Sequence, residues 1–511
     1  MDENKQKTNR KCDSFFKKMT RQGIALSYGD VRLKTTYSEV LPKETNLVSK
    51  FSRNISLNIP IVSSPMDTVT ETRMAIAMAF LGGIGIIHKS LTPQEQASYV
   101  GSVKHYLNAF IAKPVCVKES DLVESVLKMR LKKGYDFFSF PVIDNSGKVV
   151  GIVTRNDFDF CFDSSVKISE IMSKEIEQFS LIGDDIDVNT ACQRMLENRK
   201  KILPVFSKSG TFHGIFTLAD VKRIVKGDFK DYNLDALGNL RVGAAVGVGS
   251  DLEERLELLS RKNIDVIVID SAHGDSRAVI DVLKYCKANY PMIDVVVGNI
   301  SEGASAKRLV DAGADGLRIG QGPGSICTTR IIAGVGCPQV SAIYECALAV
   351  RGSGVPICGD GGIEYSGDVS IALAAGADNV MLGKVLAGTE EAPGITFWEQ
   401  GRQKKVYRGM GSLEAMIASK ASRERYLQGE NSPSKLVPEG IESKVDYKGN
   451  VSDVINQFLG GLRSGLGYLG AKDILSLQEL ADFHMITGAG LKESHPHGLD
   501  YIQNAPNYSI S

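Results

Sequence analysis

The sequence has no net charge and no long apolar run, and each absence argues against a class of protein. Lysine and arginine together number 60, as do aspartate and glutamate, so no overall field attracts nucleic acid or a membrane surface. No stretch of 18 apolar residues is free of charge or glycine, which argues against a membrane span. The polar start, residues 1–11, lacks the apolar core of a signal peptide. We therefore expect a cytoplasmic protein that requires neither membrane nor nucleic acid.

Cysteine is present without either of its common structural patterns. None of the nine cysteines forms a Cys-x-x-Cys pair, and no cysteine–histidine cluster has zinc spacing. A reduced intracellular protein is the simplest interpretation. With 511 residues, the chain is long enough for two or three domains with full cores.

Eight short apolar runs recur along the chain, and many end in glycine or a small polar residue. From the third run onward, helix-like sequence fills the gaps. Near-continuous apolar strands alternating with helices indicate an α/β protein with a parallel sheet, and eight such units predict a (β/α)₈ TIM barrel. An open doubly wound sheet is the alternative, but no run carries a Rossmann fingerprint. The runs are 59–63, 83–87, 242–246, 266–270, 295–299, 316–320, 356–360 and 379–383.

The gap between the second and third runs is too long for one helix and contains an internal repeat. Residues 141–157 match residues 204–220 at a constant offset of 63. Two units of strand, turn, strand and helix would pack as a pair inserted into the barrel. The predicted domains are therefore the first part of the barrel (1–108), the insertion (109–230, as 109–166 and 167–230) and the rest of the barrel (231–511).

The inserted pair resembles a tandem CBS (Bateman) module. In that family a Thr-x-x-Asp element lies where the riboses of adenine or guanine nucleotides bind. The resemblance implies an ATP or GTP site at Thr154, Asp157, Thr217 and Asp220. The alternative is a purely structural repeat, in which each aspartate caps the helix that follows.

The strand ends of the predicted barrel read as one surface, because active residues of such barrels lie at the C-terminal ends of the strands. Glycine-rich turns follow the seventh and eighth runs and are typical of phosphate sites, and Lys384 adds a positive charge there. Asp360 would repel a phosphate but would accept hydrogen bonds from ribose hydroxyls; its alternative role is a helix cap. The surface therefore predicts a nucleoside monophosphate site.

The stretch 320–330 places Cys327 directly behind a glycine-rich turn. Glycine permits close backbone approach to a ligand, and a cysteine displayed there becomes a nucleophile if its pKa is lowered. The alternative is a structural loop with an inert cysteine. A polar, glycine- and serine-containing segment at about 400–450 lacks apolar periodicity, so we expect a long mobile lid or flap. An arginine on that lid would clamp an anion or, in an unusual environment, act as a base.

Together these motifs resemble the IMP dehydrogenase / GMP reductase family, and within it the dehydrogenases, over nearly the whole chain. The stretches that carry the resemblance are 63–71, 322–330, 360–362, 407–412, 425–426 and 488–495. The resemblance implies that Cys327 attacks C2 of inosine 5′-monophosphate (IMP), that NAD⁺ accepts a hydride, and that the Cys327 thioimidate is hydrolysed to xanthosine monophosphate, on the way to guanine nucleotides. Arg425 would act as the base, with Thr329 and Tyr426 orienting the water.

The same resemblance implies the ligand contacts. Substrate contacts fall to Ser64, Met66, Ser325, Asp360, Gly362, Gly383, Lys384, Tyr407, Gly409, Met410, Gly411 and Glu439. NAD would be held by Asp270, Ser271, Asn299, Arg318, Gly320 and Gly322. A potassium ion would be coordinated by carbonyls of Gly322, Gly324 and Cys327 and by Glu493, Ser494 and His495 of a neighbouring subunit, which implies a homotetramer.

Three residues depart from the family pattern. Lys384 stands where serine is usual, Gln321 where a small or apolar residue is usual, and Asp275 where histidine or asparagine is commoner. We expect Asp275 to add negative charge near the pyrophosphate of the dinucleotide. The departure at Gln321 leaves the geometry of the potassium loop open.

Two other functions compete with the dehydrogenase. GMP reductase shares the barrel and the cysteine loop, deaminates GMP with NADPH, and is suggested by the stretch 335–339. Arg425, Tyr426, the segment 437–449 and the tail at 493–495 favour the dehydrogenase instead. A non-catalytic nucleotide sensor, built from the CBS pair on an inactive barrel, is the alternative of another class.

Overall fold

The computed structural model divides the chain into two compact units. It describes residues 10–107, 110–111, 114–133, 135, 137–174, 176, 180–182, 187–208, 210–227, 229–426, 428, 432–499, 505 and 507–508. One unit comprises Met1–Lys104 and Lys230–Ser511, and the other His105–Phe229. The sequence-based boundaries fall after residue 108, against 104 in the structure, and after residue 230, against 229.

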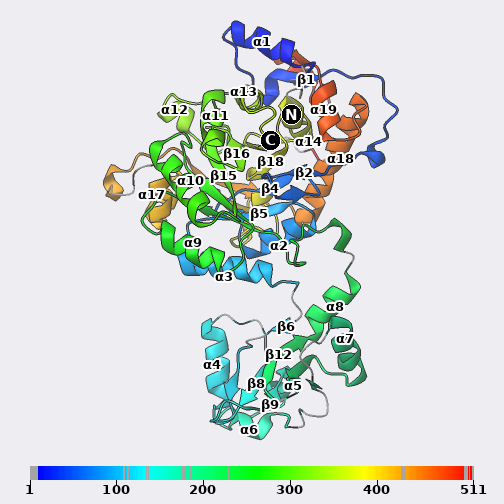
Figure 1. Cartoon of the computed structure of the whole chain (residues 1–511), viewed down its shortest axis with the longest axis vertical. Helices are drawn as coiled ribbons and strands as arrows, with labels where there is room; N and C mark the ends of the chain where they lie inside the picture. The colour runs from blue at the N-terminus through cyan, green and yellow to red at the C-terminus, as the bar shows by residue number, and fades with distance from the viewer. Residues whose placement is uncertain are drawn as a thin grey trace, which may run out of the picture. The chain divides into compact units, whose positions relative to one another are not determined.

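Eight parallel strands close into a barrel, as predicted (Figure 1). Closure is completed where the last strand pairs with the first, Val380 opposite Ile61, which excludes the open sheet. Each strand lies inside a predicted run or exceeds it by one residue at either end. The strands are β4 (Ile61–Ser63), β5 (Ile84–Ile87), β13 (Gly243–Val246), β14 (Val266–Asp270), β15 (Asp294–Ile300), β16 (Gly316–Ile319), β17 (Ile357–Asp360) and β18 (Asn379–Leu382).

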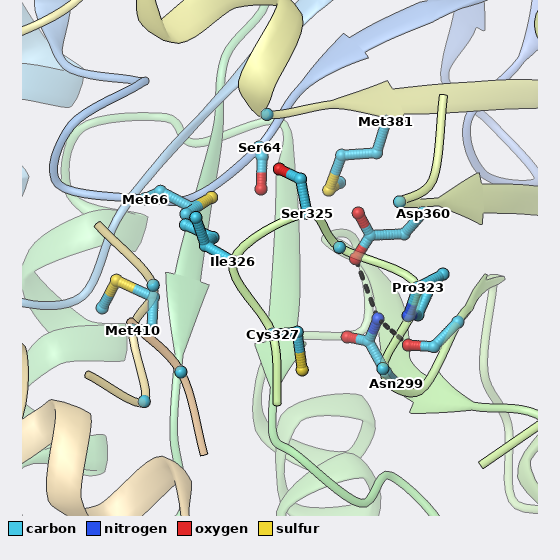
Figure 2. Close-up of a pocket in the computed structure, with 18 of the residues that line it drawn as sticks. Ser64, Met66, Asn299, Pro323, Ser325, Ile326, Cys327, Asp360, Met381 and Met410 are labelled. Atoms are coloured by element: carbon cyan, nitrogen blue, oxygen red, sulfur yellow. Dashed lines mark hydrogen bonds between the residues drawn. The ribbon is translucent and has the colours of Figure 1, made fainter. Parts of the chain in front are cut away.

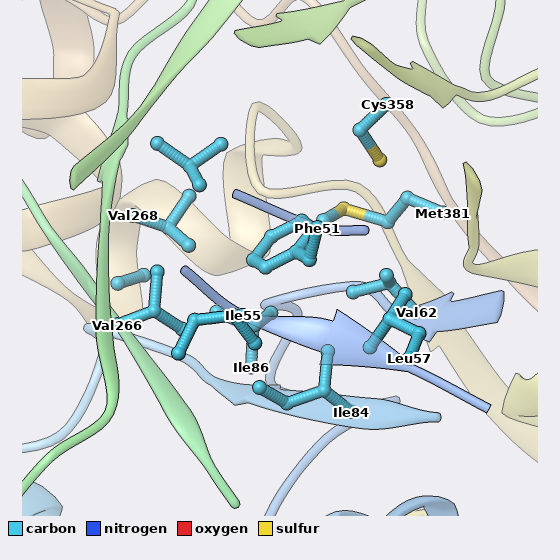
Figure 3. Packing of buried hydrophobic residues seen from close by; sticks show 12 residues of the cluster. Phe51, Ile55, Leu57, Val62, Ile84, Ile86, Val266, Val268, Cys358 and Met381 are labelled. Carbon is cyan, nitrogen blue, oxygen red and sulfur yellow. The ribbon is translucent and has the colours of Figure 1, made fainter. Parts of the chain in front are cut away.

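The barrel interior is filled by apolar side chains from alternate strand positions (Figure 3). Successive residues of a strand point to opposite faces, so Val266 and Val268 face inward while Ile267 faces the helices. Fully buried Phe51 follows the short strand β2 (Ser49–Lys50), and its carbonyl lies against Gly316 at the start of β16. It therefore closes the N-terminal end of the barrel and leaves the opposite end for a site.

Helices cover the outer face of the barrel, which is why its strands are apolar on both faces. The covering helices are α2 (Thr72–Phe80), α3 (Pro93–Lys104), α9 (Leu252–Ser260), α10 (Arg277–Asn289), α11 (Gly303–Asp311), α13 (Gln339–Ala349), α14 (Ser366–Ala375), α15 (Lys384–Ala387) and α18 (Val451–Leu469). Among the described helices, none combines the length and hydropathy that crossing a bilayer needs.

The inserted unit shows its repeat in the backbone. Two hairpins, each followed by a helix, turn at Gly147 and Gly210, and both glycines have φ of +84°. Each hairpin also shifts register at the matched place, after Val142 and after Val205. The repeated elements are β8 (Phe140–Ile143), β9 (Val149–Val153) and α5 (Arg155–Asp159), and β11 (Ile202–Phe206), β12 (Phe212–Thr217) and α8 (Leu218–Lys226).

The expected lid loop is instead built on a three-stranded antiparallel sheet, so its prediction as irregular was wrong. The sheet comprises β19 (Phe397–Glu399), β20 (Arg402–Arg408) and β21 (Glu442–Asp446). Between β20 and β21 run α16 (Leu413–Ala418), α17 (Lys420–Arg425) and a single turn of 3₁₀ helix (Pro433–Lys435). β21 is exposed at four of its five positions, so it lacks the alternation by which a half-buried strand is recognised. We call residues 409–441, between the two long strands, the flap.

Candidate active site

The strand ends and the flap enclose one cavity of about 330 Å³. Its lining includes every residue predicted as catalytic or as a substrate contact. These residues are Cys327, Thr329, Arg425 and Tyr426, together with Ser64, Met66, Ser325, Asp360, Gly362, Gly383, Lys384, Tyr407, Gly409, Met410, Gly411 and Glu439. Figure 2 labels six of them, which are Ser64, Met66, Ser325, Cys327, Asp360 and Met410. The barrel thus brings together residues that are up to 375 positions apart, from Ser64 to Glu439.

The predicted dinucleotide and potassium residues divide between this cavity and other places. Asp270, Asn299, Arg318, Gly320 and Gly322 line the cavity, as does Gly324. Ser271 instead donates its hydroxyl to the carbonyl of His273, 3.2 Å away. Glu493, Ser494 and His495 lie at the end of α20 (Gly488–Glu493), outside the lining residues, and Nδ1 of His495 is 3.0 Å from the Tyr508 hydroxyl.

A tight glycine turn brings Cys327 to the cavity. Gly320 has φ of +145°, and a Cβ there would collide with the carbonyl oxygen of Asp360. The Cys327 amide donates to the Gly324 carbonyl at 3.0 Å, which closes the turn. The Cys327 sulfur lies 3.1 Å from the Thr329 hydroxyl, a donor able to stabilise a thiolate.

Other cysteines of the barrel unit are poor nucleophiles by comparison. Burial raises the pKa of Cys286 to about 12, and burial with the neighbouring Asp13 raises the pKa of Cys12 to about 11. Burial also raises the pKa of Cys358 well above its ordinary value. Cys327 is half-buried and faces the cavity, so the inert interpretation fits those three cysteines better than Cys327.

The flap docks directly on the cysteine loop. Cys327 forms an antiparallel bridge with Gly440, the Thr328 amide donates to the Glu439 carbonyl at 2.9 Å, and the Ile441 amide donates to the Ile326 carbonyl at 3.0 Å. The Tyr426 ring lies against Gly411, where any Cβ would collide with it. Backbone pairing and ring packing therefore hold Tyr426 and Glu439 beside the Cys327 loop.

Arg318 joins the two carboxylates of the site. Its fully buried guanidinium pairs with Asp270 and lies 3.3 Å from the Asp360 carboxylate, and its Nε donates to the Asn299 side chain at 2.8 Å. Asn299 donates in turn to Asp360 at 2.8 Å (Figure 2). Through these bonds Arg318 orients Asp270 and Asp360, and its contact with a dinucleotide stays a prediction.

Asp360 does not cap the next helix, as its alternative role required. The capping box of α14 is made by Asp368, whose carboxylate accepts from the Tyr365 amide at 2.9 Å. Asp360 instead holds its carboxylate in the cavity. A carboxylate oriented by Arg318 and Asn299 is suited to accept hydrogen bonds from sugar hydroxyls.

Arg425 of the flap shares a carboxylate with the predicted dinucleotide site. Its guanidinium pairs with Asp270, and its carbonyl accepts from the Ala272 amide at 3.2 Å. With the flap in this position, the carboxylate predicted to hold the cofactor already has two cationic partners, Arg318 and Arg425.

Two of the residues that depart from the family pattern, Lys384 and Asp275, have polar partners in other elements. Nζ of Lys384 donates to Glu364 at 2.9 Å, and both side chains are partly exposed, so its charge is neutralised at the rim of the cavity. Asp275 accepts from Ser305 at 2.8 Å and from Arg308 at 2.9 Å. The negative charge that we expected Asp275 to add is therefore paired with Arg308, and its effect on a bound pyrophosphate stays a prediction.

The residues predicted to bind a nucleotide in the inserted unit act as helix caps. The Thr154 amide and hydroxyl donate to Asp157 at 2.7 and 2.8 Å, at the start of α5. Thr217 donates to Asp220 at 2.5 Å, at the start of α8. Capping accounts for both Thr-x-x-Asp elements in structural terms, and nucleotide binding there stays a prediction.

Lys89, for which no role was predicted, lies outside the cavity lining and contacts a residue of the site. It follows β5 and is buried, and its ammonium donates to the Asp270 carbonyl at 3.0 Å. Burial, and then the positive charge of Arg425, lower the pKa of Lys89 to about 7. The available signal was a lysine at the end of an apolar strand, directly before the predicted ligand surface.

Replacing Lys89 by methionine is expected to change how stability depends on pH. The native pKa of about 7 lies below the ordinary 10.5, so between these values the unfolded chain binds more protons and wild-type stability rises with pH. Relative to Lys89→Met, the wild type should gain about 4 kcal/mol between about pH 6 and about pH 10. Thermal unfolding of both proteins across this range measures the difference, and a constant difference would contradict the burial of a titrating amine.

The chain resembles known proteins both in its sequence and in its structure. The chain matches the family model described as the IMP dehydrogenase / GMP reductase domain over residues 25–497. It is 47% identical to inosine-5′-monophosphate dehydrogenase of Aquifex aeolicus, over 95% of this chain and 98% of that protein. It is 44% identical to inosine-5′-monophosphate dehydrogenase of Bacillus subtilis, over 97% and 99%. GMP reductase from Trypanosoma brucei, solved in complex with guanosine 5′-monophosphate, superposes with a TM-score of 0.82 at 39% identity and covers 93% of this chain and 98% of that chain.

Proposed function

The chain belongs to the IMP dehydrogenase / GMP reductase family, and we propose on that premise that it oxidises IMP to xanthosine 5′-monophosphate with NAD⁺. One observation carries the assignment within the family, which is the convergence of Cys327, Arg425 and Tyr426 on a single cavity. A cysteine adduct that is to be hydrolysed needs a group that activates water. The flap supplies polar groups of that kind beside the sulfur.

The first half of the reaction is covalent. The Cys327 thiolate adds to C2 of the hypoxanthine ring, and C2 then loses a hydride to become the carbon of a thioimidate joined to the sulfur. The Thr329 hydroxyl, 3.1 Å from the sulfur, stabilises the thiolate before attack. Bound NAD⁺ supplies the hydride acceptor. The lining suits a dinucleotide, since the Asp270 carboxylate faces the same cavity and can accept from ribose hydroxyls. The Asn299 side chain is bonded to Gly320, Asp360 and Arg318 and positions these groups.

The second half is hydrolysis. Arg425 first releases its guanidinium proton to solvent, and the neutral guanidine then accepts a proton from a water molecule that Thr329 and Tyr426 orient. The oxygen adds to C2, and the C–S bond breaks. The thiolate returns to Cys327, xanthosine monophosphate leaves, and the proton passes to solvent. Because Arg425 pairs with Asp270 when the flap is docked, the flap and the dinucleotide use this carboxylate in turn.

The substrate contacts divide by the chemistry of IMP. Asp360 accepts from the ribose, while Ser64 and Met66 line the adjoining wall of the cavity. Phosphate contacts fall to Ser325, Gly362, Gly383 and Tyr407, and contacts with the base to Gly409, Met410, Gly411 and Glu439. Lys384 reaches the phosphate only if it leaves Glu364.

A two-armed assay tests the reaction. With IMP and NAD⁺, absorbance at the NADH band should rise in proportion to xanthosine monophosphate formed. The second arm supplies GMP and NADPH, because the superposable Trypanosoma brucei structure is a GMP reductase. NADPH oxidation in that arm, with no NADH from IMP, would assign the reductase. If neither arm shows turnover, a non-catalytic nucleotide sensor is the remaining function.

Potassium would bind at the carbonyls of Gly322, Gly324 and Cys327. Carbonyl oxygens suit a monovalent cation, and the Gly324 oxygen keeps a second lone pair after accepting from Cys327. Three carbonyls do not complete a coordination shell, so Glu493, Ser494 and His495 of a neighbouring copy would supply the rest in a homotetramer. Turnover that is the same in potassium and sodium buffers would remove the ion site, and a monomer in sedimentation would remove the tetramer.

The inserted unit would bind ATP or GTP as a tandem CBS module. Its backbone repeat, with matched turns and register shifts, supports this, although Thr154, Asp157, Thr217 and Asp220 already cap helices. Calorimetry with either nucleotide, with the barrel site saturated by IMP, tests it, and absence of heat would remove it. The nine free cysteines support the cytoplasm as the location.

A further inference from the structure

Gln321 bonds through its side chain to two neighbouring strand-end loops. Its Nε2 donates to the Ala272 carbonyl at 3.1 Å and lies 3.2 Å from Nδ1 of His273, after β14. Its Oε1 accepts from the hydroxyl of Ser301, after β15, at 2.7 Å. One glutamine side chain, itself after β16, therefore connects the ends of three adjacent strands.

The backbone of Gln321 is fixed separately from its side chain. Its carbonyl accepts from Nε of Arg330 at 2.9 Å, and Arg330 follows Cys327 by three positions. A change of the side chain alone leaves this bond in place. The cysteine loop and the side-chain clamp can therefore be tested independently.

The flap bonds to the same segment that Gln321 holds. The Ala272 amide donates to the Arg425 carbonyl at 3.2 Å, while the Ala272 carbonyl accepts from Gln321. Asp270, the carboxylate predicted to hold the dinucleotide, lies two residues before Ala272 and pairs with Arg425. A single short segment thus meets the dinucleotide and the flap at different stages, and Gln321, which also lines the cavity, holds it through the Ala272 carbonyl.

We propose that Gln321 is a positioning residue for the dinucleotide half of the site, acting through residues 271–273. The inference rests on the proposed function. The bonds of the Gln321 side chain run to the loops after β14 and β15, and its partners do not include the phosphate turns after β17 and β18. Its influence therefore falls on the dinucleotide and on flap docking rather than on IMP.

The two bonds are of a kind that an apolar replacement cannot reproduce. Ser301 is only 3% exposed, so its hydroxyl loses its partner inside the protein when Oε1 is removed. The Ala272 carbonyl loses its bond from Gln321 Nε2. A buried polar group left without a partner favours a shift of the loop that carries it.

Gln321→Met, which keeps the length of the side chain, provides the test. We expect KM for NAD⁺ to rise about tenfold, the effect of losing one or two such hydrogen bonds, while KM for IMP and the alkylation rate of Cys327 stay unchanged. Ser301→Ala should raise KM for NAD⁺ in the same direction, and the double variant should be no worse than Gln321→Met, because both act through one bond. Gln94→Met, at an exposed glutamine on α3, is the matched control.

Gln321→Glu separates the two bonds. The carboxylate still accepts from Ser301 but places an acceptor against the Ala272 carbonyl, so KM for NAD⁺ should remain raised. Full recovery in this variant would overturn the role of Ala272.

Other outcomes overturn the whole inference. Equal rises in KM for NAD⁺ and for IMP, or additive effects of Gln321→Met and Ser301→Ala, would reduce Gln321 to general support of the loop. If Gln321→Met does not fold, Ser301→Ala carries the test, and an unchanged KM for NAD⁺ in it overturns the proposal. Wild-type protein that makes no NADH from IMP defeats the proposed function instead, so the two failures are distinguishable.

Discussion

Cys327→Ala is expected to lower turnover of IMP by about 10⁴-fold or more while leaving IMP binding within about threefold, since the nucleophile forms the bond on which both half-reactions depend. The cavity keeps its ribose carboxylate, phosphate turns and flap contacts in this variant. The sulfur's hydrogen-bond partner is Thr329, which belongs to none of these groups. Initial NADH rates measure the loss, and calorimetry with IMP measures the binding. Cys161→Ser, in the inserted unit, is the matched control and should retain full turnover.

The intact mass of the protein tests the same prediction directly. Wild-type protein quenched during turnover with IMP and NAD⁺ should carry the mass of a purine nucleotide on Cys327, and Cys327→Ala should carry none. Residual turnover within tenfold of the wild type in Cys327→Ala would rule out covalent catalysis at this residue. A nucleotide sensor would bind IMP equally in both proteins and make no NADH in either.

Arg425→Ala is expected to separate the two half-reactions. Loss of the base should slow hydrolysis by about 10²–10⁴-fold, whereas adduct formation, which does not need Arg425, should continue. A single burst of NADH, equal to the concentration of sites, would then precede a slow steady state. Intact mass should show nearly complete occupancy of Cys327 during that steady state.

The ion pair with Asp270 adds a second expectation for Arg425→Ala. Removing the guanidinium leaves the Asp270 carboxylate available to the dinucleotide, so KM for NAD⁺ should fall or stay constant rather than rise. Arg402→Ala, at an exposed arginine on the sheet that carries the flap, is the control and should behave as wild type, because surface ion pairs contribute little. Loss of the burst together with the steady state would place Arg425 in adduct formation and contradict its role as base.

The barrel was predictable because its strands are buried on both faces. Such strands form continuous apolar runs that stand out from any background, as the runs at 266–270 and 295–299 do. The rule that barrel sites lie at strand ends then places Cys327 and Asp360 on one surface without any knowledge of side-chain contacts. The sheet that carries the flap was not predicted, because β21 is exposed at four of its five positions and its sequence shows no alternation of apolar and polar residues.

The sequence by itself determined the number and order of the barrel strands and the repeat inside the insertion, because these depend on apolar runs, turns and chain order, all of which are local. The residues predicted to line the cavity came from the resemblance to a known family. Only the tertiary structure decided that Lys384 pairs with Glu364, that Arg308 neutralises Asp275, that Arg318 links Asp270 to Asp360, and that Gln321 clamps residues 272 and 301. The physical reason is that the state of a charge or amide depends on partners brought from other loops by barrel closure, and no local pattern records which partner arrives.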